Sequence, residues 1–394
     1  MNTVIAQPQR NTPLALPTLR EGIIVWALLG GIVSMLFAMN VSLAQELSKP
    51  SREFVQAVAP REWQFPRDHG KHAEFQTEWW YYTGNLRSAK GRRFGYQLTF
   101  FRNALSIEPP TRQSRWAFRD GYVAHFTITD VDQQKFFYDQ SMSRGALGLA
   151  ESANDSLAVR VGAWSIEGGN AAMRLQAESE FGHIDFKLEN THAPALHGRN
   201  GFVQKGEQSS EASYYYSLPN LKTQGSLRLG EDSLLVEGTS WMDHEFFTSP
   251  RQSQIAGWDW FSLRLSDSTA IMLYVLREAD GTLSSFSGGT VISKNENVTP
   301  ISFGSFEASP QSWWRSDATG GEYPIAWQLK VAEYELRITT PVENQELGTR
   351  TTTGVIYWEG YIEVSGTKRG QSLNGLGYLE MTGYTLGLDL SQKN

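Results

Sequence analysis

The residues best suited to acid–base chemistry stand in one short run, WMDHEF at 241–246. In a β-strand alternate side chains share a face, so Trp241, Asp243 and Glu245 would point one way and His244 the other. Two carboxylates beside an indole would raise each other's pKa, as a general acid needs near neutral pH. The same residues suit a structural role, with the acids accepting backbone hydrogen bonds and His244 bonded in the core. Both interpretations stay open.

A second acid lies between two tryptophans, in Trp258-Asp259-Trp260. Apolar bulk on both sides favours the protonated form of a carboxyl group. Asp259 is therefore a second candidate catalytic acid, and the two tryptophans are candidate substrate-binding rings. In a regular strand these rings would lie on the face opposite Asp259. A structural aspartate that bonds a loop fits the pattern equally well.

All seven histidines lie between residues 69 and 244, so imidazole chemistry is confined to that part of the chain. His69 and His72, with a neighbouring acid, could bind a metal, but their spacing does not match a helical HExxH frame. The alternative is a hydrogen-bonded start of a strand. We expect no metal and no cofactor.

Several classes of protein are disfavoured by what the sequence lacks. There is no cysteine, which excludes disulfides, thiol nucleophiles and iron–sulfur clusters. No GxSxG elbow, Walker loop, GxGxxG or SxxK motif is present, which disfavours common serine hydrolases, NTPases and Rossmann oxidoreductases. The formal net charge of −7 argues against a nucleic-acid partner.

The elements that must position these residues are short strands. After residue 61, alternating apolar and polar stretches are separated by Gly, Asn, Asp and Ser, and helical periodicity is almost absent. Many short strands at this spacing are typical of antiparallel barrels or sandwiches. The WWYY run at 79–82 would supply one barrel wall, with Trp79 and Tyr81 on one face. The candidate strands are 79–83, 94–101, 122–128, 184–188, 234–238, 258–265, 270–276, 326–331 and 355–364.

The exported length of about 350 residues is too large for one small barrel, so two are expected. A polar break at 249–253 marks the joint between them. The predicted domains are 62–249 and 254–388, preceded by a linker at 46–61.

The first 45 residues predict export. Residues 22–39 carry no charge, and Arg10 and Arg20 precede them. Ser42-Leu43-Ala44 resembles the pattern before a signal-peptide cleavage site, which favours a cleaved signal peptide, whereas the eighteen uncharged residues also reach the lower bound for a transmembrane anchor. Either way we expect the rest of the chain in the periplasm, soluble or anchored to the inner membrane.

Seven stretches together resemble the carotenoid 1,2-hydratase and AttH-like family, whose members are often described as predicted secreted hydrolases. The resemblance covers about residues 63–384 and implies an all-β fold of two consecutive lipocalin-like antiparallel β-barrels after the N-terminal hydrophobic helix. The stretches are HAEFQTEWWYYTGNL (72–86), GYQLTFFR (95–102), SYYYS (213–217), WMDHEF (241–246), GWDWFSL (257–263), YWEG (357–360) and GYLEMTGY (377–384).

The resemblance implies acid-catalysed hydration, or a related hydrolytic step, on an apolar isoprenoid or lipid-like substrate. Such chemistry needs a protonated carboxylic acid, a dry pocket and aromatic faces that stabilise a cation. Asp259 or Asp243 would be the acid, with His244 as its partner or as the base that orients the water. The predicted catalytic set also includes Glu245, and the substrate-binding set is Trp241, Trp258, Trp260, Phe246, Trp79 and Tyr81. The alternative is a non-catalytic carrier of a hydrophobic ligand, associated with the permease of an ABC-type export system.

Overall fold

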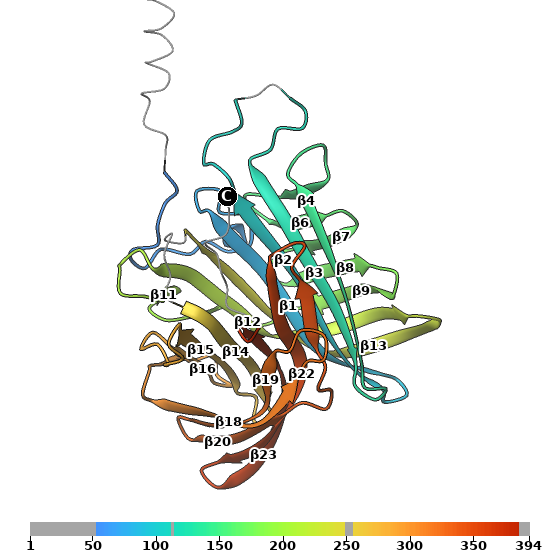
Figure 1. Cartoon of the computed structure of the whole chain (residues 1–394), viewed down its shortest axis with the longest axis vertical. Helices are drawn as coiled ribbons and strands as arrows, with labels where there is room; N and C mark the ends of the chain where they lie inside the picture. Colours follow the sequence, from blue (N-terminus) through green and yellow to red (C-terminus); the bar gives the residue numbers. More distant parts are fainter. Residues whose placement is uncertain (1–52, 112–113, 249–254, 386–394) are drawn as a thin grey trace, which may run out of the picture. The chain divides into compact units, whose positions relative to one another are not determined.

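A computed structural model describes residues 53–111, 114–248 and 255–385. Nearly all regular structure in these residues is β-strand, apart from the 3-10 helix η1 (Arg67–His69). The strands form two antiparallel sheets that are consecutive in the sequence. In Figure 1 the strands of the first sheet are coloured from blue to yellow and those of the second from yellow to red. The predicted all-β fold class is confirmed.

The first sheet has thirteen strands in the order β4-β3-β2-β1-β13-β12-β9-β8-β7-β6-β5, and β10 and β11 also pair with β12. Strands β3 and β4 at one edge lie next to β5 and β6 at the other, so the sheet curves into a nearly closed barrel. Its strands are β1 (Thr77–Ser88), β2 (Arg93–Ala104), β3 (Asp120–Asp130), β4 (Lys135–Arg144), β5 (Ala150–Ser152), β6 (Leu157–Val161), β7 (Trp164–Gly168), β8 (Ala172–Glu178), β9 (Gly182–Glu189), β10 (Ala195–Leu196), β11 (Phe202–Gln204), β12 (Ala212–Leu229) and β13 (Asp232–Phe247).

The second sheet has ten strands in the order β17-β16-β15-β14-β23-β22-β20-β19-β18, with β21 paired to β22. Its strands are β14 (Ile255–Leu265), β15 (Ala270–Glu278), β16 (Gly288–Ile292), β17 (Val298–Ile301), β18 (Phe306–Arg315), β19 (Glu322–Val331), β20 (Tyr334–Thr339), β21 (Glu346–Thr349), β22 (Val355–Lys368) and β23 (Gln371–Thr382).

Period-two alternation decides which side chains point into the apolar core that each sheet encloses. Along β3, Ala124 and Phe126 point into the core of the first sheet, whereas His125 points out of it. A second apolar cluster, which includes Phe261 and Trp327, fills the second sheet in the same way. Each strand can therefore present its other face to a different environment.

A third cluster lies where the outer faces of the two sheets meet, and we call this region the intersheet site. It contains Tyr81, Tyr215 and Trp241 from the first sheet and Trp260 and Tyr378 from the second. Both sheets belong to one compact unit that begins at Glu53. The intersheet site is where the strands gather most of the predicted functional residues.

Two predictions fall on parts of the chain that the structure does not describe. The joint predicted at 249–253 lies within residues 249–254, and the uncharged run lies within residues 1–52. The domain boundaries and the export segment therefore stay predictions. Among the described residues, no helix has the length and apolar character needed to cross a membrane.

Candidate functional site

Strand β13 separates the predicted catalytic residues by their position in the alternation. Trp241 belongs to the apolar cluster between the sheets, and Asp243 and Glu245 share its face. His244 lies on the other face and is hydrogen-bonded inside the first sheet. The expected alternation is what the structure contains, and it divides the predicted acid from its predicted histidine partner.

Asp243 is 4% exposed and is surrounded by neutral hydrogen-bond donors. The hydroxyl groups of Tyr215 and Ser217 donate to its carboxyl oxygens, and Trp241 Nε1 donates to Oδ1 at 2.6 Å. No described lysine or arginine forms an ion pair with this carboxyl. Burial outweighs the hydrogen bonds and raises the pKa of Asp243 to about 7. A large share of Asp243 is therefore protonated at neutral pH.

A neutral histidine, His197, is hydrogen-bonded to Ser217. His197 Nε2 lies 2.6 Å from Ser217 Oγ, and its Nδ1 lies 2.9 Å from Thr290 Oγ1 on β16. Burial lowers the pKa of His197 to about 3, so the ring is uncharged near neutral pH. The histidine therefore fixes the serine hydroxyl against Asp243 without bringing a positive charge near it.

Three of the predicted binding rings do gather beside Asp243. Trp260 Nε1 donates to the Tyr215 hydroxyl at 2.9 Å. The ring of Trp260 lies edge-on to Trp241, with centroids 6.2 Å apart, and edge-on to Tyr81, with centroids 5.0 Å apart. Such faces stabilise a nearby cation.

Two further carboxyls in the intersheet site were not predicted from the sequence. Glu359 is fully buried and accepts the Tyr81 hydroxyl at 2.7 Å, and the half-buried Glu380 accepts Trp258 Nε1 at 2.7 Å. The two acids are direct cross-strand partners on β22 and β23. Burial and the repulsion of Glu380 raise the pKa of Glu359 well above its usual range, and burial raises the pKa of Glu380 to about 7. At neutral pH this pair retains at least one proton.

A sequence signal for these acids was present but unused. Glu359 lies in the strand run YWEG, and Glu380 lies in the run YLEM. Each is a single carboxylate among aromatic or apolar strand residues, which is the same pattern that drew attention to Asp259. The pairing of the two strands could not be read from either run.

Glu245 and Trp79 are cross-strand partners on β13 and β1, one alternation step beyond Asp243 and Tyr81. Lys205 Nζ forms an ion pair with the Glu245 carboxylate, so this acid has the cationic partner that Asp243 lacks. The half-buried Trp79 packs edge-on against Phe247, with centroids 5.0 Å apart. Trp258 on β14 is also half-buried.

Several polar atoms that face the intersheet site have no hydrogen-bond partner in the described part of the chain. They include Thr83 Oγ1 on β1, Ser213 Oγ on β12 and Ser262 Oγ on β14, all buried. Buried polar groups in folded proteins are nearly always satisfied by protein, water or ligand. The intersheet site is therefore suited to a partner that carries polar groups as well as apolar surface.

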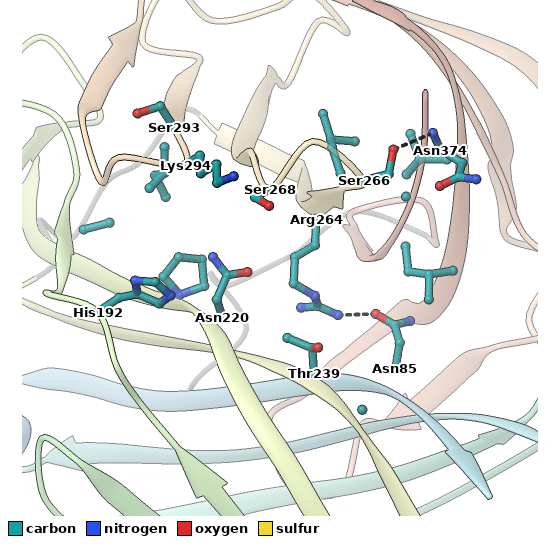
Figure 2. Close-up of a pocket in the computed structure, with 18 of the residues that line it drawn as sticks. Asn85, His192, Asn220, Thr239, Arg264, Ser266, Ser268, Ser293, Lys294 and Asn374 are labelled. Carbon is teal, nitrogen blue, oxygen red and sulfur yellow. Dashed lines mark hydrogen bonds between the residues drawn. The ribbon is translucent and has the colours of Figure 1, made fainter. Parts of the chain in front are cut away.

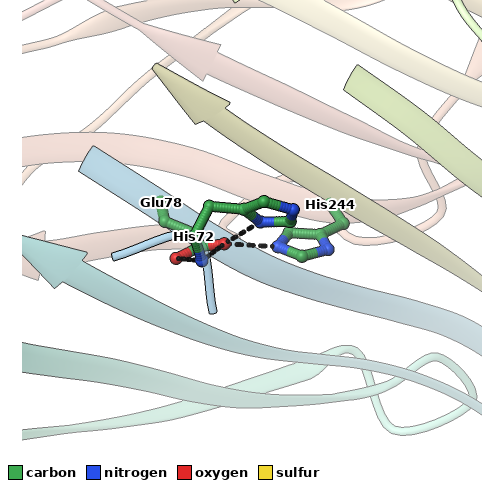
Figure 3. Close-up of side chains that lie close together, drawn as sticks. All are labelled: His72, Glu78 and His244. Carbon is green, nitrogen blue, oxygen red and sulfur yellow. Dashed lines mark hydrogen bonds and ion pairs between the residues drawn. The ribbon is translucent and has the colours of Figure 1, made fainter. Parts of the chain in front are cut away.

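Two predicted site residues, His244 and Phe246, lie outside the intersheet site, because both point away from the second sheet. His244 Nε2 is 2.9 Å from Glu78 Oε1, and His72 Nδ1 is 2.8 Å from the same oxygen, as Figure 3 shows. Phe246 stacks on His72 with ring centroids 3.6 Å apart. The assignment of His244 as the partner of Asp243 and of Phe246 as a substrate contact is corrected.

A buried arginine completes the network around Glu78. Arg102 Nε donates to Glu78 Oε2 at 3.1 Å, and its Nη1 donates to Asp120 at 2.9 Å. Although burial opposes them, hydrogen bonds from the two histidines and the charge of Arg102 lower the pKa of Glu78 well below its usual range. Burial alone would lower the pKa of His72, but bonds to Asp68 and Glu78 raise it. This network consists of compensated charges.

His72, Glu78 and His244 offer possible metal-ligand atoms within 4.8 Å of one another. Every one of their ring nitrogens already has a partner. His72 Nε2 faces Asp68 at 3.3 Å, and His244 Nδ1 faces the Tyr216 hydroxyl at 3.0 Å, while both remaining nitrogens face Glu78. A metal would have to displace these bonds, so the donor set fits a hydrogen-bonded network better than a metal centre.

Asp259 also lies apart from Asp243. It points to the opposite face of β14 from Trp258 and Trp260, where it is paired with Arg277 Nη1 at 2.5 Å and accepts the Tyr384 hydroxyl at 2.9 Å. Burial raises the pKa of Asp259, and the ion pair with Arg277 opposes that rise. The prediction that Asp259 shares one pocket with Asp243 and the tryptophans is therefore corrected: the period of the strand puts them on different faces.

Comparisons with known proteins agree with this architecture. The model of the AttH-like family matches residues 56–384. A solved structure of an AttH protein from Nitrosomonas europaea is 31% identical, with a TM-score of 0.75 over 84% of this chain and 100% of that one. Kievitone hydratase from Nectria haematococca shares the fold at 16% identity, with a TM-score of 0.66 over 85% of this chain and 97% of that one.

A curated relative carries a related chemical name. Dehydratase asqC from Emericella nidulans is 23% identical over 229 residues, which are 53% of this chain and 60% of the relative. The chain thus spans somewhat less than two thirds of that relative. The family model and the solved AttH structure cover most of the chain, and on that basis the chain belongs to the AttH-like family.

Proposed function

We propose that this protein is a hydratase or dehydratase that works by acid–base catalysis in the intersheet site, with Asp243 as the proton donor. The observation that carries the proposal is the environment of this carboxyl: it is buried, it has only neutral donors around it, and its pKa is raised to about 7. An acid with that pKa can both give and take a proton near neutral pH.

The chemistry uses one acid and one water molecule. In hydration, the Asp243 carboxyl transfers its proton to one carbon of a carbon–carbon double bond, and water adds to the resulting cation at the other carbon. The proton lost by that water returns to the carboxylate, so the acid is regenerated. Dehydration is the same sequence in reverse. The rings of Trp241, Trp260 and Tyr81 would stabilise the cation.

Glu359 and Glu380 would act as a second proton store. They lie with Tyr81 and Trp258 in the same intersheet site, and their raised pKa values keep at least one proton on the pair. The negative charge of an ionised Asp243 raises the pKa of Glu359 further. Loss of a proton from Asp243 is therefore coupled to retention of one by the pair.

The relatives support the reaction class. Kievitone hydratase and dehydratase asqC are named for the addition and the removal of water, and they share the fold or part of the sequence with this chain. We further propose an apolar isoprenoid or lipid-like substrate, supported by the aromatic rings of the site. Action in the periplasm, or at the inner membrane, is supported by the uncharged run at 22–39.

The test is to incubate the full chain with a lipid extract and to search by mass spectrometry for species that gain or lose one water. Once a substrate is found, Asp243→Asn should reduce turnover by about 10² to 10⁴-fold, because the amide keeps the shape but cannot deliver a proton. Asp259→Asn is the matched control, a buried aspartate on the other face of β14, and should keep most of its activity. Unchanged turnover in Asp243→Asn would refute the assignment.

The second candidate function is a carrier. A cavity of about 960 Å³ between the two sheets, separate from Asp243, favours this function. A carrier needs only a lined cavity, whereas an enzyme also needs the raised pKa of an acid. If a lipid co-purifies with the protein and is released from it with its mass unchanged, the protein would be a carrier. Such a carrier would work beside the permease of an ABC-type exporter.

A further inference from the structure

The intersheet interface also holds a cavity of about 960 Å³, away from Asp243. Figure 2 shows Arg264, Asn85 and Thr239 converging on it from different strands. Thr239 shares the face of Asp243 on β13 but lies roughly 13 Å further along the strand. The cavity is thus a separate region of the same interface.

Arg264 is the cation on the inner wall of this cavity. Its Nη2 donates to Asn85 Oδ1, while its Nη1 is buried without a hydrogen-bond partner in the described part of the chain. Burial lowers the pKa of Arg264 to about 10, so the guanidinium keeps its charge at neutral pH. Tyr96, Tyr361 and Tyr378 act on it electrostatically, and all three are uncharged at that pH.

None of the three carboxylates that line the cavity forms an ion pair with Arg264. Glu363 pairs with Arg93 at 2.8 Å, Glu296 contacts His192 at 2.7 Å, and Glu237 lies directly across the strand pair from Arg87. Within the described residues, Arg264 is left without an ion pair. An uncompensated charge in a partly desolvated cavity is costly unless an anion from outside supplies the partner.

We propose that this cavity binds a small organic molecule through a carboxylate group that pairs with Arg264. The apolar side chains of Ala195, Ile292, Val298 and Leu376 belong to the cluster between the sheets, line the same cavity and would contact the rest of the molecule. A carboxylate fits better than a phosphate dianion, because Arg264 offers a single unpartnered nitrogen, Nη1, and one charge, which a monoanion matches. The inference needs no catalysis at Asp243 and stands independently of the proposed reaction.

The first experiment compares three probes by isothermal titration calorimetry on the full chain: octanoate, its uncharged analogue octanamide, and octyl phosphate. Octanoate should bind about tenfold or more tightly than octanamide, because it adds a charge-assisted hydrogen bond. Equal affinity for the two, or no measurable binding of octanoate, overturns the proposal. Tighter binding of octyl phosphate than of octanoate overturns the choice of a carboxylate.

The second experiment assigns the preference to one residue. Arg264→Gln should bind octanoate no more tightly than octanamide. Its affinity for octanamide should equal that of the wild type, and this equality would show that the cavity has kept its shape. Arg264→Lys should keep part of the preference, because it keeps the charge but not the fork of donors. Arg337→Gln, at an exposed arginine on β20 outside the cavity, is the matched control and should keep all of it. A preference that survives in Arg264→Gln contradicts the assignment.

Discussion

Two buried carboxylate clusters lie on opposite faces of β13 and differ in what surrounds the acids. Inside the first sheet, Glu78 meets Arg102 and two histidines, and its pKa is lowered. Between the sheets, Asp243 meets only hydroxyl and indole donors, and its pKa is raised to about 7. Burial alone therefore does not mark an acid that can exchange protons. In these two clusters the difference is the cationic partner, which Glu78 has and Asp243, within the described residues, lacks.

The comparison also separates stabilising groups from reactive ones. In a network of compensated charges, removal of any one member destabilises the fold, because it leaves another charge buried and unpaired. A protonated carboxyl among neutral donors is already uncharged, so an amide can replace it at little cost. The two clusters should consequently respond in opposite ways to the same chemical change.

The largest expected effect is on folding stability when Glu78 is neutralised. Glu78→Gln removes the buried negative charge that meets Arg102, His72 and His244 and leaves Asp120 as the only acidic partner of Arg102 among the described residues, so it should lower the free energy of unfolding by about 3 to 5 kcal/mol. Glu359→Gln, the same change in the intersheet site, should cost less than about 1 kcal/mol, because its pKa keeps it neutral already. Urea denaturation measures both. Similar costs for the two variants would remove the distinction.

A smaller effect is expected in the pH dependence of stability. The pKa of Asp243 is raised from 3.8 to about 7 by folding, so its contribution is complete below about pH 4 and is lost as the pH rises towards 7. Between pH 5 and 7.5 this loss amounts to about 2 to 3 kcal/mol.

Asp243→Asn should therefore show a shallower fall in stability with rising pH than the wild type, by about that amount. Any fixed cost of the substitution cancels, because only the slopes are compared. Urea denaturation at several pH values provides both slopes. Parallel slopes in wild type and variant would mean that Asp243 is ionised throughout.

The sequence was most informative where structure depends on local alternation. The strands around residues 122–128 and 184–188 were predicted because period-two patterns are local, and β3 and β9 occupy these positions. The same alternation correctly divided Trp241 and Asp243 from His244. It also put Asp259 on the face opposite its tryptophan neighbours, so combining all of them in one pocket was an error that the period itself forbids.

What the sequence could not supply were contacts between distant strands. Tyr81 and Glu359 meet although 278 residues separate them in the chain, and the pairing of Glu359 with Glu380 depends on the register of β22 and β23. Neither follows from a local pattern. The charge state of an acid also depends on such contacts, since Lys205 compensates Glu245 whereas no described cation compensates Asp243.

The most direct test of the account is the titration of Asp243 itself. Carbon NMR of protein labelled at the aspartate carboxyl carbons, recorded from pH 3 to 9, follows each group separately, and comparison with Asp243→Asn identifies the resonance that is missing. We predict that this resonance titrates with a midpoint near pH 7. A midpoint at or below the value of an ordinary aspartate, about 3.9, would contradict the claim that the intersheet site holds a protonated acid.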